Sequence, residues 1–74
     1  MIWRHYKVGL YRIICMAYDA SGYDGLKFVV YENIHTGSRW FRPMKEFFGL
    51  VRDGNSMICR FKAQTKIETP VILK

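Results

Sequence analysis

Short apolar runs alternate with clusters of turn-forming residues along the chain, and this alternation limits what the chain can fold into. Runs rich in β-branched and aromatic residues cover residues 10–18, 26–32, 39–42 and 56–62. Gly, Asp, Asn and Ser are concentrated between these runs, at residues 19–25, 33–38 and 53–55. Residues of the first kind favour strands, and those of the second kind favour tight turns. The pattern predicts a mostly β fold, a small barrel or rolled sheet of four to five short antiparallel strands.

One helical turn is expected near residues 43–48. Pro43 should end the preceding strand, because proline has no N–H for the ladder. Proline is tolerated at a first helical position, and Gly49 can end the turn. The chain of 74 residues is predicted to form a single domain over residues 1–62. Residues 63–74 would be a C-terminal extension, either an added strand or a contact with a second copy.

Composition limits the class of protein. Twelve Lys and Arg against six Asp and Glu give a net charge of +6, and half of the residues are hydrophobic. A transmembrane helix needs about 20 consecutive apolar residues, and no such stretch is present. With no signal-peptide pattern, the sequence predicts a cytoplasmic globular protein without a membrane partner. So small an interior cannot bury all the aromatics, so exposed apolar surface should mark a ligand, a partner or a homo-oligomer interface.

The sequence contains no recognisable catalytic or metal-binding pattern. Cys15, Cys59, His5 and His35 lack the short paired spacings of a structural zinc site. Both cysteines are predicted to be free thiols in the core, with a disulfide or zinc as the less favoured alternatives. A glycine-rich phosphate loop and a nucleophile elbow are also missing. We expect no catalytic residues, no metal and no cofactor. An enzyme using His5 is the disfavoured alternative.

Cations and aromatics are interleaved in two runs, residues 3–7 and 39–42. In a strand, Trp40 and Arg42 share one face, with Arg39 and Phe41 on the other. An indole beside a guanidinium can stack on a nucleobase and contact a phosphate. The expected ligand-binding residues are Arg4, His5, Tyr6, Lys7, Arg39, Trp40, Arg42 and Arg60. The alternatives are that Trp3, Tyr11 and Phe41 belong to the core and that Arg42 ties the strand end to Glu46.

Charge is unevenly distributed along the chain. Residues 1–18 and 54–67 carry Lys and Arg but no acidic residue. If the first and last strands are neighbours, these cations form one positive surface, as expected for the site of a polyanion.

Several of these residues also carry a family resemblance. The segments Trp3-Arg4-His5-Tyr6-Lys7, Phe28-Val29-Val30-Tyr31, Trp40-Phe41-Arg42-Pro43-Met44 and Arg60-Phe61, with Tyr11 and Phe47, resemble the family called domain of unknown function 1653. The resemblance covers most of residues 3–61. It implies a small SH3-like β-barrel of a kind found in bacteria and phages. Val8-Gly9 and Asp19-Ala20-Ser21 depart from the family pattern, so a role of the latter loop is not carried over.

The leading functional prediction is a non-catalytic binding module for an anionic nucleotide-type ligand. That ligand would be nucleic acid or a phosphorylated or cyclic nucleotide, and a phage-type sequestering protein fits this description. The alternative is a protein-protein interaction module or an inhibitor of a host protein, which would use an exposed aromatic patch with a basic rim.

Overall fold

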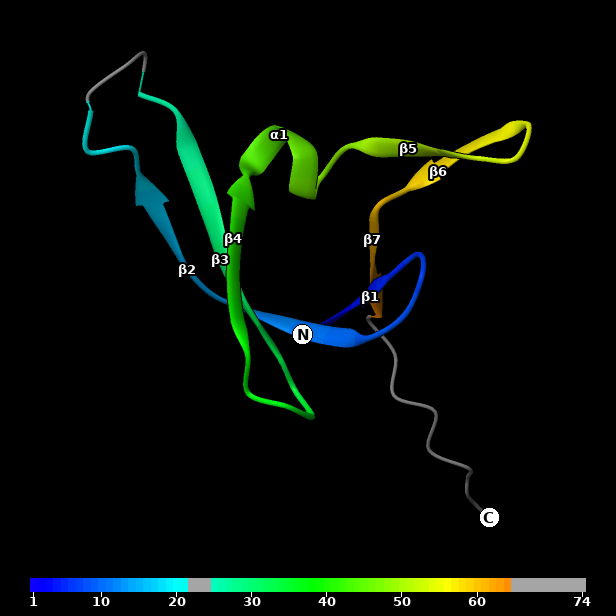
Figure 1. Cartoon of the computed structure of the whole chain (residues 1–74), viewed down its shortest axis with the longest axis horizontal. Helices are drawn as coiled ribbons and strands as arrows, with labels where there is room; N and C mark the ends of the chain where they lie inside the picture. The colour runs from blue at the N-terminus through cyan, green and yellow to red at the C-terminus, as the bar shows by residue number, and fades with distance from the viewer. Residues whose placement is uncertain (22–24, 65–74) are drawn as a thin grey trace.

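The computed structural model describes residues 1–21 and 25–64, which form seven strands and one short helix (Figure 1). The elements in chain order are β1 (Ile2–His5), β2 (Leu10–Tyr18), β3 (Lys27–Asn33), β4 (Arg39–Pro43), α1 (Met44–Phe47), β5 (Leu50–Asp53), β6 (Ser56–Cys59) and β7 (Phe61–Gln64). The prediction of a mostly β, antiparallel fold with one helical turn is confirmed.

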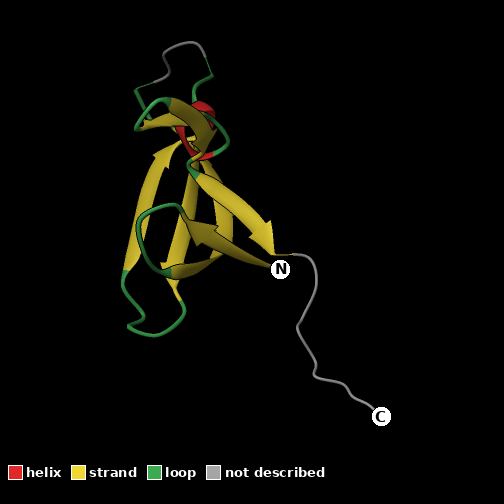
Figure 2. Cartoon of the chain, turned by 90° about the vertical axis from the view of Figure 1, so that its right-hand side faces the viewer, coloured by secondary structure: helices red, strands yellow, loops and turns green. Residues whose placement is uncertain are grey.

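The strands form two antiparallel ladders. Five of them make one sheet in the order β4-β3-β2-β1-β7, and β5 pairs only with β6 in a hairpin. Viewed from the side, the strands of the larger sheet curve rather than lie flat (Figure 2). A bulge between Ile13 and Cys15 shifts the register of β2 against β3, and bulges add bend and twist to a sheet. Within the described residues the ladder is not closed, and β4 and β7 are its edges.

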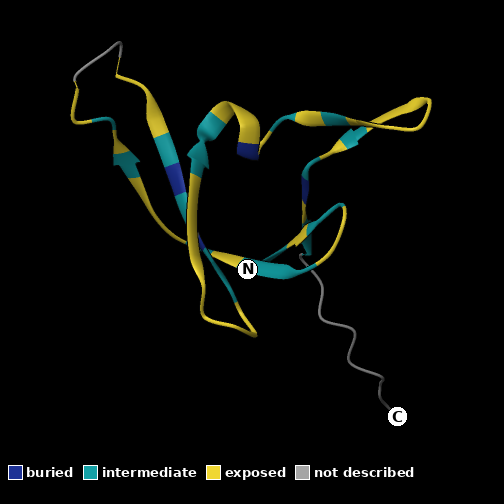
Figure 3. Cartoon of the chain, viewed as in Figure 1, coloured by how far each residue is buried: buried dark blue, intermediate teal, exposed yellow. Residues whose placement is uncertain are grey.

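Aromatic rings make up most of the core. Val29 and Phe47 are fully buried, and Tyr31 and Phe61 are nearly so (Figure 3). Trp3, Tyr11, Ile13 and Met44 pack around them as partly buried residues. Because Val29 and Tyr31 alternate along β3, they lie on one face of the sheet, which we call the inner face. The helix contributes Phe47 to this core.

The short helix begins after Pro43 and ends before Gly49, the two residues that the sequence indicated. Pro43, with φ of −53°, is the last residue of β4 and precedes the first helical residue, Met44. The Gly49 N–H donates to the Glu46 carbonyl just beyond the helix. A Cβ added at Gly49 would lie 2.5 Å from the Lys45 carbonyl oxygen, so a larger residue could not make this close approach. Glycine is therefore required where the helix ends.

Two strands were not predicted, and one predicted strand is divided. β1 and β5 are additional, and the predicted run 56–62 becomes β6 and β7, separated at Arg60. The Arg60 N–H donates to the Gly49 carbonyl at 3.0 Å, which extends the hairpin pairing by one residue before β7 begins. β7 continues to Gln64, two residues beyond the predicted domain end, and most of the predicted extension lies outside the described residues.

The cysteines differ from expectation in their burial. Cys15 and Cys59 are both free, but both are exposed, so the prediction that they belong to the core is wrong. Strand alternation explains this for Cys15, since it pairs with Val30 and points away from the inner face. In the part of the chain that the structure describes, no helix is long and apolar enough to span a bilayer.

Candidate functional site

Six side chains surround a small depression of about 180 Å³ on the inner face of the larger sheet. We call this depression the aromatic cradle. Its lining residues are His5, Tyr11, Tyr31, Trp40, Arg42 and Phe61. They come from β1, β2, β3, β4 and β7, so every strand of the larger sheet contributes at least one side chain. The curvature of that sheet therefore brings together residues far apart in the sequence.

Trp40 and Arg42 share the inner face, as strand alternation predicted. Trp40 pairs with Tyr31 and Arg42 with Val29, two residues that point into the core. Trp40 nevertheless stays 55% exposed, because it lies on the edge strand and above the rim of the cradle. An indole in this position presents a wet aromatic surface beside a guanidinium.

The Arg42 guanidinium is held in place by two acceptors. Its Nε donates to the Tyr31 hydroxyl at 3.2 Å, and its Nη1 donates to Glu46 Oε1 at 3.3 Å. The Tyr31 hydrogen bond is the main reason that the pKa of Arg42 is raised, and Glu46 adds to it. The alternative in which Arg42 ties the strand end to Glu46 is therefore correct. Among the described residues, Arg42 Nη2 has no protein acceptor, so one arm of the fork remains available to a ligand.

His5 borders the cradle as a neutral imidazole. Its Nδ1 accepts a hydrogen bond from the Lys7 backbone N–H at 3.2 Å, which assigns the proton of the neutral ring to Nε2. Burial is the main cause of its lowered pKa, and the positive charges of Arg42, Arg60 and Lys7 lower it further. Three cations with an uncharged histidine among them create a local field that favours an anion.

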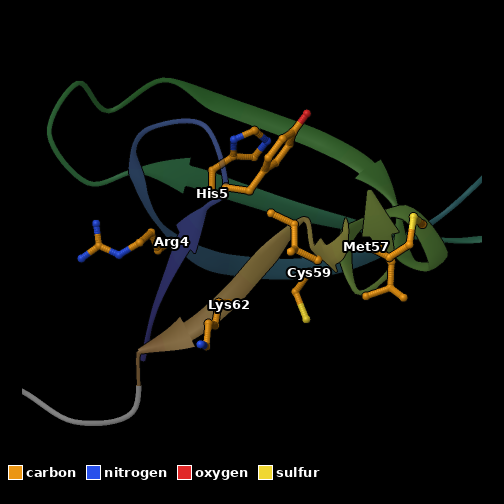
Figure 4. Close-up of a pocket in the computed structure, with 8 residues that line it drawn as sticks. Arg4, His5, Met57, Cys59 and Lys62 are labelled. Atoms are coloured by element: carbon orange, nitrogen blue, oxygen red, sulfur yellow. The ribbon is translucent and has the colours of Figure 1, made fainter. Parts of the chain in front are cut away.

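A second depression, of about 470 Å³, lies on the other side of His5 (Figure 4). We call it the hairpin groove. It is lined by Arg4, His5, Tyr6, Leu50, Met57, Ile58, Cys59 and Lys62. Arg4 and Lys62 are cross-strand partners on β1 and β7, and Met57 and Cys59 belong to the hairpin. The first and last strands are thus neighbours, and two of the predicted cations lie side by side.

Backbone hydrogen bonds fix the position of the hairpin beside this groove. The Tyr6 N–H donates to the Arg60 carbonyl at 2.9 Å, and the Arg60 N–H donates to the Gly49 carbonyl at 3.0 Å. Arg60 thereby links the end of β1 to the start of the hairpin. Its side chain is also engaged, since Nε donates to the Glu46 carbonyl at 3.0 Å. Main-chain hydrogen bonds therefore fix the positions of the strands that line the groove.

The outer face of the sheet carries a different set of residues. Arg39 and Arg12 both contact the Glu32 carboxylate, with N–O distances of 3.6 and 3.1 Å. Phe41 is 70% exposed and makes an edge-to-face contact with Phe28 at 5.5 Å between ring centroids. Next to this pair, Ala17, Tyr18 and Val30 help line an apolar depression of about 320 Å³.

The structure divides the eight predicted ligand-binding residues among several places. His5, Trp40 and Arg42 line the cradle. Arg4 and Tyr6 line the groove, which shares His5 with the cradle. Lys7 is exposed, with its Nζ 5.8 Å from the centroid of the Tyr6 ring. Arg39 lies on the outer face and Arg60 is bonded to the helix, so neither joins the cradle.

The sequence did not identify Tyr31 and Phe61 as site residues, and for Tyr11 it offered a place in the core as the alternative. The available signal was the resemblance itself. All six residues that line the cradle are among those that carry the resemblance in the sequence. Their separate motifs converge on one depression, and this convergence becomes visible only when the strand order is known.

Comparison with known proteins identifies a family but no function. A family model described as "Protein of unknown function (DUF1653)" matches residues 1–63. Neither a curated protein nor a solved structure matches the chain. Within residues 1–21 and 25–64, no group of three or more His, Cys, Asp or Glu side chains could hold a metal ion.

Proposed function

The chain belongs to the DUF1653 family of proteins of unknown function, and we propose that it binds an anionic ligand carrying a nucleobase, without catalysing a reaction on it. The observation that carries this proposal is the exposed indole of Trp40 beside the guanidinium of Arg42 at the mouth of the aromatic cradle. Trp40 supplies a surface for base stacking, worth about 1–3 kcal/mol per base. Arg42 Nη2 supplies a charged donor for a phosphate oxygen.

The field around the cradle supports an anionic rather than a neutral ligand. Arg42, Arg60 and Lys7 all lower the pKa of His5, so their charges contribute to a positive electrostatic potential at this site. Arg4 and Lys62 add two cations in the adjoining groove. An approaching anion would interact favourably with all of these groups, and its association rate would fall as salt screens them.

The lining of the cradle supports binding rather than catalysis. It consists of five aromatic side chains, counting His5, and one arginine, with no carboxylate or thiol among them. A general acid or base would have to be His5, whose Nδ1 already accepts the Lys7 N–H.

Matched substitutions on one strand test this proposal. Trp40→Leu removes the inner-face indole, and Phe41→Leu removes an exposed ring from the outer face of the same strand. We expect AMP, a decanucleotide or both to raise the melting temperature of the wild type and to quench its tryptophan fluorescence. Trp40→Leu should weaken binding about tenfold, as expected for the loss of one stacked base. Phe41→Leu should bind as the wild type does.

A second candidate function is a protein-interaction module, and the outer face favours it. Phe41 and Tyr18, at 70% and 68% exposure, flank an apolar depression next to the Arg12–Glu32–Arg39 ion pairs. Exposed apolar surface of this kind is often the site at which a partner protein or a second copy of the same chain binds. Binding there would be lost in Phe41→Leu and retained in Trp40→Leu, the reverse of the result expected for the cradle.

Salt separates the two candidates independently of the substitutions. The logarithm of the binding constant for an oligonucleotide should fall linearly with the logarithm of salt concentration, because each phosphate contact releases counterions. An apolar protein interface should change little. If no phosphate compound stabilises the protein at low salt, the cradle proposal fails and the outer face becomes the leading candidate.

A further inference from the structure

The cradle accepts one ring system and no more, so the remainder of a nucleotide ligand must lie elsewhere on the protein. Its volume of about 180 Å³ is bounded on the inner side by Tyr31 and Phe61, both of which are buried core residues. These rings cannot move aside without disturbing the core. A ligand held by Trp40 must therefore extend outward past the rim of the cradle.

His5 connects this rim to the hairpin groove. Its imidazole lines both depressions, and the Tyr6 ring lies 4.9 Å from it between centroids. We call this pair of rings the His5–Tyr6 ridge, since His5 lines both depressions and Tyr6 lines the groove. Because Nδ1 of His5 accepts the Lys7 N–H, Nε2 is the ring nitrogen that remains available to donate a hydrogen bond. A phosphate crossing the ridge would meet this N–H group.

The hairpin groove has the composition of a second base site. Tyr6, Leu50, Met57 and Ile58 provide aromatic and aliphatic contacts, and the cross-strand partners Arg4 and Lys62 provide positive charge. Its volume of about 470 Å³ is more than twice that of the cradle. A purely electrostatic phosphate site would not need the apolar wall, and a purely apolar partner would gain nothing from the cations.

We propose that the cradle and the hairpin groove together bind two nucleosides joined by a phosphodiester, with the linking phosphate over the His5–Tyr6 ridge. This inference rests on the proposed function, since it uses the cradle for the first base. The second base lies against Met57 and Leu50, and Arg4 and Lys62 contact the sugar-phosphate part. Such a ligand is either a free dinucleotide or a two-nucleotide step of a single strand.

The experiment compares AMP, the linear dinucleotide ApA and a ten-nucleotide adenine strand by tryptophan fluorescence titration. A second stacked base should make ApA bind about tenfold or more tightly than AMP, although AMP carries the greater phosphate charge. If the decanucleotide binds no better than ApA, the natural ligand is a free dinucleotide. A further gain with length, together with a steep dependence on salt, identifies a single strand.

Two methionine substitutions separate the groove from the cradle. Met57 is 54% exposed and lines the groove, whereas Met16 is 47% exposed on β2 and lines neither depression. Met57→Thr should reduce ApA binding towards the level of AMP and leave AMP binding unchanged. Met16→Thr is the matched control and should change neither. Trp40→Leu, which lacks the reporting indole and is therefore followed by thermal shift, should weaken binding of both ligands.

The outcomes distinguish failure of this inference from failure of the proposed function. Equal affinity for AMP and ApA, with no effect of Met57→Thr, overturns the two-base inference and leaves one-base binding in the cradle intact. If neither AMP, ApA nor the strand binds, both proposals are wrong. A loss of AMP binding in Met57→Thr would place the first base in the groove and overturn the assignment of that base to the cradle.

Discussion

The ring of Phe47 lies parallel to the ring of Phe61, with 4.1 Å between centroids and an interplanar angle of 9°. Phe47 comes from the short helix and Phe61 from the last described strand, so this stack joins the helix to the sheet. Other ring pairs around it meet edge to face, including Tyr31 with each of these two phenylalanines. The core is therefore a cluster of aromatic rings, and the stack lies within it.

Shortening one ring of the stack should destabilise the protein. Phe61→Leu leaves a space that the rigid neighbours cannot fill and should lower the free energy of unfolding by on the order of 1–2 kcal/mol. In a domain of this size, 1 kcal/mol shifts the melting temperature by about 4–8 °C. Phe41→Leu, at an exposed position, is the control and should melt near the wild type. Equal melting temperatures for the two variants would show that the stack does not stabilise the fold.

Removing the Tyr31 hydroxyl should loosen Arg42. The hydroxyl accepts the Arg42 Nε at 3.2 Å, and Tyr31→Phe leaves Glu46 as the only side-chain acceptor for this guanidinium in the described residues. We expect a loss of about 0.5–1.5 kcal/mol in stability, and a severalfold weaker affinity for AMP. Tyr18→Phe removes a hydroxyl from an exposed ring that does not line the cradle and should leave both quantities unchanged. Denaturant melts and fluorescence titrations measure them.

His5 should make stability depend on pH below its ordinary pKa of 6.5. Burial and nearby cations lower the folded-state pKa, so the unfolded chain takes up a proton at a higher pH than the folded protein does. The free energy of unfolding should fall as pH drops from 6.5 through the lowered pKa, and His5 adds no further loss below it. His5→Gln should flatten this part of the profile. Urea midpoints between pH 7.5 and 4.5 test this, and parallel profiles for wild type and His5→Gln would contradict it.

Gly9 should tolerate alanine less well than Gly37 does. Both have positive φ, of 103° and 78°, so alanine is strained at either position. At Gly37 the added Cβ meets open space, and the cost should be about 1–2 kcal/mol. At Gly9 the Cβ would also lie 2.8 Å from Cε1 of Tyr11, a ring that lines the cradle. Gly9→Ala should therefore melt at a lower temperature than Gly37→Ala and weaken AMP binding. Equal melting temperatures would show that the Tyr11 ring moves aside without cost.

Strands with strong local signals were predictable, and strands that depend on distant partners were not. β2 and β3 have long runs of β-branched and aromatic residues bounded by turns, and these residues favour strands in any context. β1 alternates aromatic and basic residues, a pattern equally suited to a binding segment. It forms a strand because both β2 and β7 pair with it, and no local pattern reveals a partner about 60 residues away. β5 is explained in the same way by its pairing with β6.

The candidate site was predictable only within single strands. The period of two placed Trp40 and Arg42 on one face, and their cross-strand partners confirm this. That same period separates Arg39 from them, on the outer face. Tyr31 and Phe61 could not be joined to the site, because their contribution depends on which strands are neighbours. Likewise, local patterns do not indicate that Arg4 and Arg42 line different depressions.

The position of β1 has a consequence for how the protein is made. Ile2 pairs with Gln64 and His5 with Phe61, so β1 gains its second neighbour only when residues 61–64 have been synthesised. Until then the edge of β1 lacks this partner, and an open strand edge invites pairing with other chains. The ladder therefore cannot form in full before Phe61–Gln64 exist, and a truncation that removed these residues would leave a nascent polypeptide prone to aggregate.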